Sequence, residues 1–155
     1  ATTTTTSTSS TTTTVAAGTT TFEPLIADPN QTPEQQVEAA YLYSWEVYLD
    51  AAARGDTSAL SVVYRGPALE VVRKEIEEFV SSGHRVGGDV EFNYVTTVQD
   101  DNFADVVDAY RNHLVLIDAG TGQPLEDDPN EEVVFHYTLE RVDGTWFVTS
   151  LTSYS

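Results

Sequence analysis

The sequence predicts an α+β domain in which three N-terminal helices pack on a strongly bent antiparallel sheet. Apolar residues recur at helical spacing from residue 32 to residue 82, and after two adjacent glycines they alternate with polar residues, as in strands. Short turn signals separate the alternating runs, which is typical of strands that pair with their sequence neighbours. The length of 155 residues suits a single domain.

The first helix is expected to begin after Thr32. Thr32 and Gln35 form a capping-box pattern, and Pro33 stands at the first helical position, where its missing N–H costs nothing. Gly55 supplies the C-terminal stop. The apolar stripe of this helix consists of Val37, Tyr41, Trp45, Tyr48 and Ala51.

Two further helices are expected before the strands. The second is short, over residues 57–64, with Asp56 as its N-cap. The third runs from Pro67 to about Ser82 and stops at Gly83. Its apolar stripe consists of Leu69, Val72, Ile76, Phe79 and Val80.

The sheet is expected to contain four antiparallel strands. Asp143 and Gly144 form a strong two-residue hairpin signal between the last two of them, and an acidic loop over residues 123–132 precedes the third. The expected strands cover residues 89–99, 103–118, 133–142 and 145–154.

Residues 1–31 are predicted to be a disordered linker and residues 32–155 the folded domain. Of the first 21 residues, 13 are Thr and 3 are Ser. Such side chains bury too little surface to offset the entropy of ordering the backbone, and the composition is typical of extracellular stalks. We expect a spacer between the domain and a surface; the alternative is a tail with no tethering role.

The charge balance excludes several classes of partner. Asp and Glu number 25 against 7 Lys and Arg, a formal net charge of −18. Such a field repels phosphate backbones and anionic headgroups, so neither nucleic acid nor a lipid surface is an expected partner. The chain contains no cysteine, which excludes disulfides and thiolate metal sites. No cofactor is expected.

Four segments, in this order and at this spacing, resemble one known superfamily: residues 41–60, 66–88, 106–125 and 142–151. From Thr32 to Tyr154 the chain resembles the NTF2-like (SnoaL-like, cystatin-like cone) superfamily. Within it, the chain is most similar to uncharacterised secreted lipoproteins of actinobacteria and similar bacteria. The resemblance implies a cone-shaped fold and an extracytoplasmic, surface-anchored or secreted protein. A lipidated cysteine precedes the linker in such lipoproteins; it is absent here, so membrane attachment is expected only through a missing N-terminal anchor.

Enzymes of this superfamily place an acid or base inside the cone, and the best candidates here are Asp108 and Tyr110. They share a strand face with Leu114, whereas His113 and His136 are expected on the outer face. The alternative is that Asp108 is a buried, hydrogen-bonded structural residue. No catalytic dyad of a known enzyme can be transferred residue by residue, which favours a non-catalytic domain.

Aromatic residues are the candidates for a ligand pocket. They either fill the core or line a cavity in the cone, and the sequence leaves this open. The candidates are Tyr41, Trp45, Tyr48, Tyr110, Tyr137 and Trp146.

The leading functional hypothesis is an extracytoplasmic, surface-tethered domain that binds a protein partner or a small apolar ligand. The alternative is an isomerase-, dehydratase- or cyclase-like enzyme that uses a carboxylate in the cone.

The acidic segments 99–102 and 126–132 do not match a calcium-loop pattern, so no metal is expected. Apolar residues on both faces of the strands predict a homodimer through the sheet; they include Val107, Val115, Val134 and Phe147.

Overall fold

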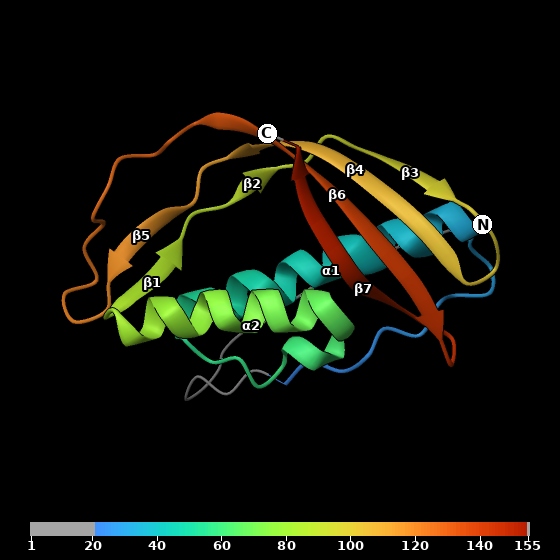
Figure 1. The fold of residues 1–155 in the computed structure, drawn as a ribbon, viewed down its shortest axis with the longest axis horizontal. Helices are drawn as coiled ribbons and strands as arrows, with labels where there is room; N and C mark the ends of the chain where they lie inside the picture. Colours follow the sequence, from blue (N-terminus) through green and yellow to red (C-terminus); the bar gives the residue numbers. More distant parts are fainter. Residues whose placement is uncertain (1–20, 155) are drawn as a thin grey trace, which may run out of the picture.

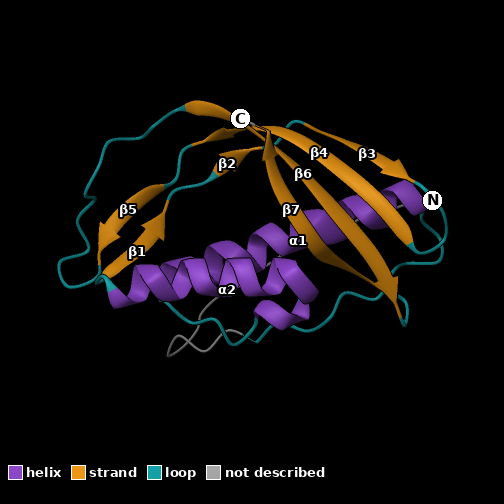
Figure 2. Cartoon of the chain, viewed as in Figure 1, coloured by secondary structure: helices purple, strands orange, loops and turns teal. Residues whose placement is uncertain are grey.

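The computed structural model describes residues 21–154. Two helices lie along one side of a strongly curved antiparallel sheet, and a two-stranded arm extends from one end (Figure 1, Figure 2). The predicted α+β class is therefore confirmed. The elements are α1 (Pro33–Arg54), η2 (Leu60–Val62), α2 (Gly66–Ser81), β1 (His84–Gly87), β2 (Val90–Glu91), β3 (Tyr94–Val98), β4 (Phe103–Asn112), β5 (Val115–Asp118), β6 (Glu131–Val142) and β7 (Thr145–Tyr154).

Helix α1 begins and ends as its sequence predicts. The Gln35 backbone N–H donates to Thr32 Oγ1 (3.2 Å), and the Thr32 N–H donates to Gln35 Oε1 (2.9 Å), so the capping box is complete. Gly55 closes the helix in the left-handed conformation, with φ of 71°. These local signals place the aromatic stripe of α1 under the sheet.

The prediction of three helices is wrong, because the structure has two α-helices. Residues 57–64 form only the single 3₁₀ turn η2. The backbone after this turn pairs with β7 instead: Val148 N–H donates to Val63 O (2.9 Å), and Arg65 N–H donates to Val148 O (3.0 Å). Pairing with a distant strand outweighs the weak helical preference of a segment with two adjacent valines.

The predicted strand over residues 89–99 is divided into β2 and β3. The division occurs at Asn93, whose backbone N–H donates to Asp108 Oδ1 (2.8 Å). A buried carboxylate thus takes a donor that a continuous ladder would have used.

The predicted strand over residues 103–118 is divided into β4 and β5. The break lies at His113, whose carbonyl oxygen approaches Gly88 so closely that a Cβ at Gly88 would collide with it. Gly88 also has φ of 97°, a conformation that favours glycine. Beyond the break, β5 pairs with β1, a strand that the sequence pattern did not predict.

The main sheet has the order β2-β4-β6-β7, and β3 also pairs with β4. The hairpin at Asp143 and Gly144 is confirmed: both have positive φ, 51° and 80°, as a two-residue turn between β6 and β7 requires. The core lies between the sheet and the helices. Its fully buried large side chains include Tyr41, Leu60, Ile76, Leu139 and Val148.

The segment before α1 contacts the domain. Ala27 N–H donates to Gly144 O (2.9 Å), Gln36 Nε2 donates to Asp28 O (2.8 Å), and the Phe22 ring lies 6.1 Å from that of Tyr43. Residues 1–20, most of the predicted linker, lie outside the described residues. In the part of the chain that the structure describes, no helix has the length and hydropathy of a membrane-spanning one.

Candidate functional site

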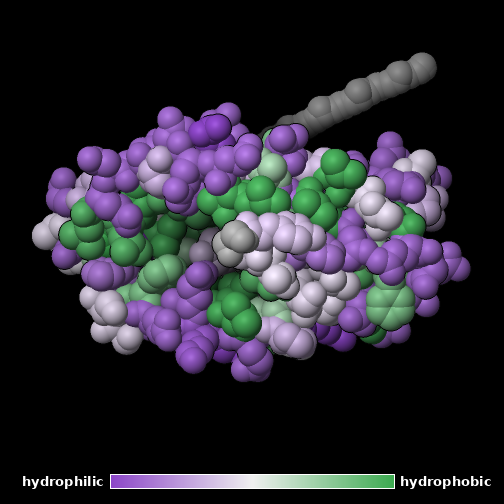
Figure 3. All heavy atoms as spheres, turned by 45° about the horizontal axis from the view of Figure 1, so that its top comes forward, coloured by the Kyte–Doolittle hydropathy of each residue, from purple (hydrophilic) through white to green (hydrophobic). Residues whose placement is uncertain are grey.

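A cavity of about 270 Å³ lies between the helices and the curved sheet. Residues of α1, α2, β4, β6 and β7 line it, together with the segments that follow η2 and β4. In Figure 3 one face of the molecule is hollowed, with hydrophobic side chains gathered around the hollow. We call the cavity between the helices and the sheet the aromatic cavity, after the side chains that dominate its lining: Trp45, Tyr48, Tyr64, Tyr110, Phe135 and Tyr137.

The rings of the aromatic cavity meet at varied angles. Tyr48 and Tyr110 stand nearly perpendicular to Trp45, with interplanar angles of 81° and 74° and centroid distances of 5.6 and 5.2 Å. Phe135 stacks between Tyr110 and Tyr137, at 6.2 and 5.9 Å. Edge-to-face and offset contacts are the favoured aromatic geometries, so the rings support one another around the space.

The periodicity of each element explains why these rings converge. Trp45 and Tyr48 lie three residues apart and therefore on one side of α1. Phe135 and Tyr137 lie two residues apart and therefore on one face of β6. Tyr64 reaches the cavity because its segment pairs with Val148 of β7.

Asp108 is completely buried behind the aromatic cavity. The Tyr41 hydroxyl donates to Asp108 Oδ2 (2.6 Å), and the Asn93 N–H donates to Oδ1 (2.8 Å). Trp45 Nε1 in turn donates to the Tyr41 hydroxyl (2.9 Å). Both oxygens of Asp108 thus have partners, as a carboxylate removed from water requires.

The hydroxyl groups around the cavity are protonated at neutral pH. Burial raises the pKa of Tyr41, Tyr48, Tyr64 and Tyr137 far above the usual value. Burial, with a smaller effect of the Asp108 charge, raises the pKa of Tyr110 to about 12. The tyrosines therefore offer neutral hydroxyls and no phenolate.

One charged side chain stands out among the described residues that line the cavity: Glu75 of α2. The Tyr48 hydroxyl donates to Glu75 Oε1 (2.8 Å). Ser44 and Asn112 add neutral polar groups to the lining. The cavity is thus aromatic, with few polar groups and one carboxylate.

The structure brings together four of the six predicted pocket residues: Trp45, Tyr48, Tyr110 and Tyr137 line the aromatic cavity. Tyr41 lies behind them, bonded to Asp108. Trp146 lies elsewhere, in a second cavity of about 200 Å³ beside α1 and residues 25–28. The ligand role of all six stays a prediction.

Sequence analysis missed Tyr64, Glu75 and Phe135 as members of the lining. Phe135 shares its alternation with Tyr137 and could have been included. Glu75 directly precedes Ile76 of the apolar stripe, so its place beside the stripe was the one available signal. Tyr64 could not be placed, because its segment was expected to be helical.

The predicted catalytic pair is separated in the fold. Tyr110 lines the aromatic cavity, whereas Asp108 is not part of the lining. His136 bonds Asp105 through Nε2 (2.8 Å) and stacks on Tyr154, away from the cavity. No group of three or more His, Cys, Asp or Glu side chains within residues 21–154 is arranged to hold a metal ion.

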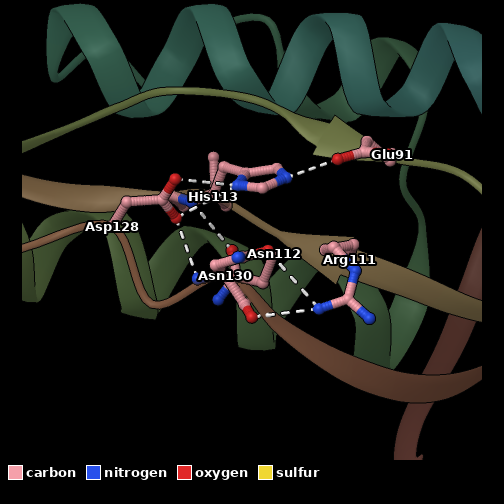
Figure 4. A network of polar contacts seen from close by, with 7 residues as sticks. Glu91, Arg111, Asn112, His113, Asp128 and Asn130 are labelled. Atoms are coloured by element: carbon pink, nitrogen blue, oxygen red, sulfur yellow. Dashed lines mark hydrogen bonds and ion pairs between the residues drawn. The ribbon is translucent and has the colours of Figure 1, made fainter.

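His113 holds the acidic loop against the sheet (Figure 4). Its Nε2 lies 2.6 Å from Glu91 Oε2, and its Nδ1 lies 2.9 Å from Asp128 Oδ2. The contact with Glu91, followed by that with Asp128, raises the pKa of His113, and His113 lowers the pKa of Asp128. Arg111 donates to the carbonyl oxygen of Asn130 (3.0 Å) and secures the end of the same loop. We call this group the His113 clamp.

No protein-family model matches the chain, and no curated protein matches it. Among solved structures, the chain is similar to the intermembrane space region of the chloroplast protein ARC6, with 12% identity and a TM-score of 0.61 over 81% of this chain and 98% of that one. This similarity shows a shared fold.

Other solved structures that match include NTF2-like proteins, the group that the sequence resemblance indicated. One is an NTF2-like protein of unknown function from Shewanella oneidensis MR-1, with 17% identity and a TM-score of 0.48 over 77% of this chain and 99% of that one. Another is an NTF2-like protein from Cytophaga hutchinsonii, with 14% identity and a TM-score of 0.49 over 76% of this chain and 97% of that one.

Proposed function

We propose that this chain is an extracytoplasmic, surface-tethered NTF2-like domain that binds a small molecule with apolar surface and catalyses no reaction on it. The observation that carries the proposal is the aromatic cavity. Ligand pockets are typically concave, largely apolar spaces of roughly 300–1,000 Å³ with a few placed polar groups. A cavity of about 270 Å³ suits a small ligand and therefore supports the small-molecule hypothesis.

The position of Asp108 supports a binding role rather than the enzymatic alternative. A general base must come within hydrogen-bond reach of the proton that it removes. Asp108 is fully buried, its oxygens accept from Tyr41 and Asn93, and it does not line the cavity. The Tyr110 hydroxyl, with a pKa of about 12, is also a poor base at neutral pH.

The tether rests on composition. The Thr- and Ser-rich start of the chain has the composition of an extracellular stalk. Fractionation of the producing cells tests this part: the protein is expected with the cell surface or in the medium. Recovery from the cytoplasm alone would refute the tether and leave the ligand site untouched.

A neutral fluorescent probe tests the ligand site. N-phenyl-1-naphthylamine is expected to bind the wild-type protein with a rise in its fluorescence. Leu151→Trp fills the cavity from β7 and is expected to weaken binding about tenfold, since the displaced volume is part of the site. Leu125→Trp, on an exposed loop residue outside the lining, is the control and is expected to bind as wild type. Equal binding by all three proteins would refute the site.

A further inference from the structure

We infer that the ligand of the aromatic cavity is a small methylated ammonium ion, whose cationic head lies among the rings and near Glu75. This inference rests on the proposed function, because it names the class of ligand for the same site.

The lining is suited to a cation first because of its rings. Trp and Tyr faces carry negative potential and attract cations, most strongly where water is excluded. Tyr48 and Tyr110 stand at 81° and 74° to Trp45, so rings border the space from different directions. The tyrosines are neutral, and no basic side chain among the described residues lines the cavity.

Glu75 supplies the matching charge. It alone is charged among the described lining residues, and its Oε1 is engaged by the Tyr48 hydroxyl (2.8 Å). Glu75 is exposed, so its Oε2, which accepts no hydrogen bond from a described residue, is accessible to water and to a ligand. An anionic ligand would meet this carboxylate without a compensating cation, in a protein of net charge −18, whereas a cation is attracted by both.

Tyr110 indicates a polar group on the same ligand. Its side chain lines the cavity and is 7% exposed, and its hydroxyl, which is itself accessible, makes no hydrogen bond with residues 21–154. A phenolic hydroxyl can donate one hydrogen bond, so an oxygen of a ligand in the cavity is a suitable acceptor for this one.

The polar groups also distinguish between kinds of ammonium. A primary ammonium has three N–H donors to satisfy. The lining offers one carboxylate and mainly aromatic and aliphatic surface, which matches methyl groups better than N–H donors. The predicted ligand is therefore a methylated ammonium that carries a hydroxyl or carbonyl oxygen.

Calorimetric titration with choline and with 3,3-dimethylbutan-1-ol tests the inference. The second compound has the shape of choline, with carbon in place of the cationic nitrogen. Choline is expected to bind about tenfold more tightly, the size of a desolvated cation–π contact. Glu75→Gln is expected to weaken choline binding about three- to fivefold and to leave the neutral compound unchanged. Glu78→Gln, on the same helix but outside the lining, is the control for net charge.

The outcomes separate the inference from the proposed function. Equal affinity for the two compounds, or binding of the naphthylamine probe without choline binding, overturns the cation inference and leaves the cavity as a ligand site. Absence of binding by all three compounds overturns both. Tyr110→Phe, which keeps the ring, is expected to weaken choline binding about threefold through the lost hydroxyl. Unchanged choline binding in this variant would overturn the oxygen contact.

Discussion

Asp108 and Asp128 are carboxylates that the fold holds in opposite ways. Asp108 is fully buried in β4, and its partners are the neutral hydroxyl of Tyr41 and the backbone N–H of Asn93. Asp128 lies in the exposed acidic loop, where it pairs with His113 and accepts from the Asn130 N–H (2.8 Å). Water can replace the partners of Asp128, whereas it cannot reach Asp108.

The difference indicates which carboxylate supports the whole fold. Tyr41 lies 67 residues from Asp108 in sequence, so their hydrogen bond joins the helix layer to the sheet. His113 lies 15 residues from Asp128, and their contact only fixes a loop. A lost surface ion pair changes stability little, whereas a buried donor left without a partner costs about 1–3 kcal/mol.

The largest expected effect comes from removing the buried carboxylate. Asp108→Ala leaves the Tyr41 hydroxyl and the Asn93 N–H without their acceptor, and we expect a loss of about 3 kcal/mol in the free energy of unfolding. Asp128→Ala is the matched control, with an expected loss below about 0.5 kcal/mol. Urea denaturation measures both. Equal losses in the two variants would contradict the comparison.

Tyr41→Phe is expected to have the next largest effect. It keeps the ring but removes the acceptor of Trp45 Nε1 and the donor to Asp108 Oδ2, at a cost of about 2 kcal/mol. Tyr154→Phe, at a residue that is 56% exposed, is the control and is expected to be neutral. Because Tyr41 is not part of the lining, probe affinity should stay at the wild-type value. A loss of binding without a loss of stability would instead indicate a direct role for Tyr41 in the site.

Sequence patterns predicted the features that depend on neighbouring residues. The capping box at Thr32 and the hairpin at Asp143 and Gly144 are local, and the structure has both. The aromatic stripe of α1 is likewise a matter of helical period, so Trp45 and Tyr48 could be placed under the sheet in advance.

Features that depend on distant partners were not predictable in the same way. Tyr64 enters the cavity because residues 63–65 pair with Val148 of β7, a contact that no local pattern encodes. Asp108 divides the strand opposite it by binding the Asn93 N–H. Glu75 could not be placed from the sequence, because a residue at the edge of an apolar stripe can face either the solvent or the interior.

The His113 clamp should have a smaller effect, one that depends on pH. The pKa of His113 is raised by Glu91 and Asp128, so its contribution is fully present below the unfolded value of about 6.5 and is lost as pH rises through the folded value. The pKa of Asp128 is lowered, so its contribution is present above about 3.9 and is lost as pH falls through the folded value. The clamp is therefore complete between about pH 4 and pH 6.5.

Amide hydrogen exchange in the acidic loop measures this dependence. Protection of residues 123–130, the part of this loop before β6, is expected to decrease in the wild type from pH 6 to pH 9 after correction for intrinsic exchange. His113→Gln should give low protection at every pH, because glutamine cannot carry the charge that binds both carboxylates. A loop whose protection does not change with pH in either protein would show that Arg111 and the backbone alone secure it.

The last prediction concerns the outer face of the sheet, whose exposed side chains would be buried if a second copy of the chain packed on it. Phe147, one of the residues that suggested a dimer, is already covered within the chain: the Arg65 guanidinium lies 4.0 Å above its ring. Val95 and Val107 remain 69% and 37% exposed.

We predict a two-fold dimer through Val95 and Val107. Salt is expected to strengthen the dimer, because it screens the repulsion between two chains of net charge −18. Sedimentation should detect a species of twice 17.0 kDa that Val95→Lys with Val107→Lys dissociates and Leu125→Lys does not. A single species near 17.0 kDa that salt does not shift would mean that the valines simply face water.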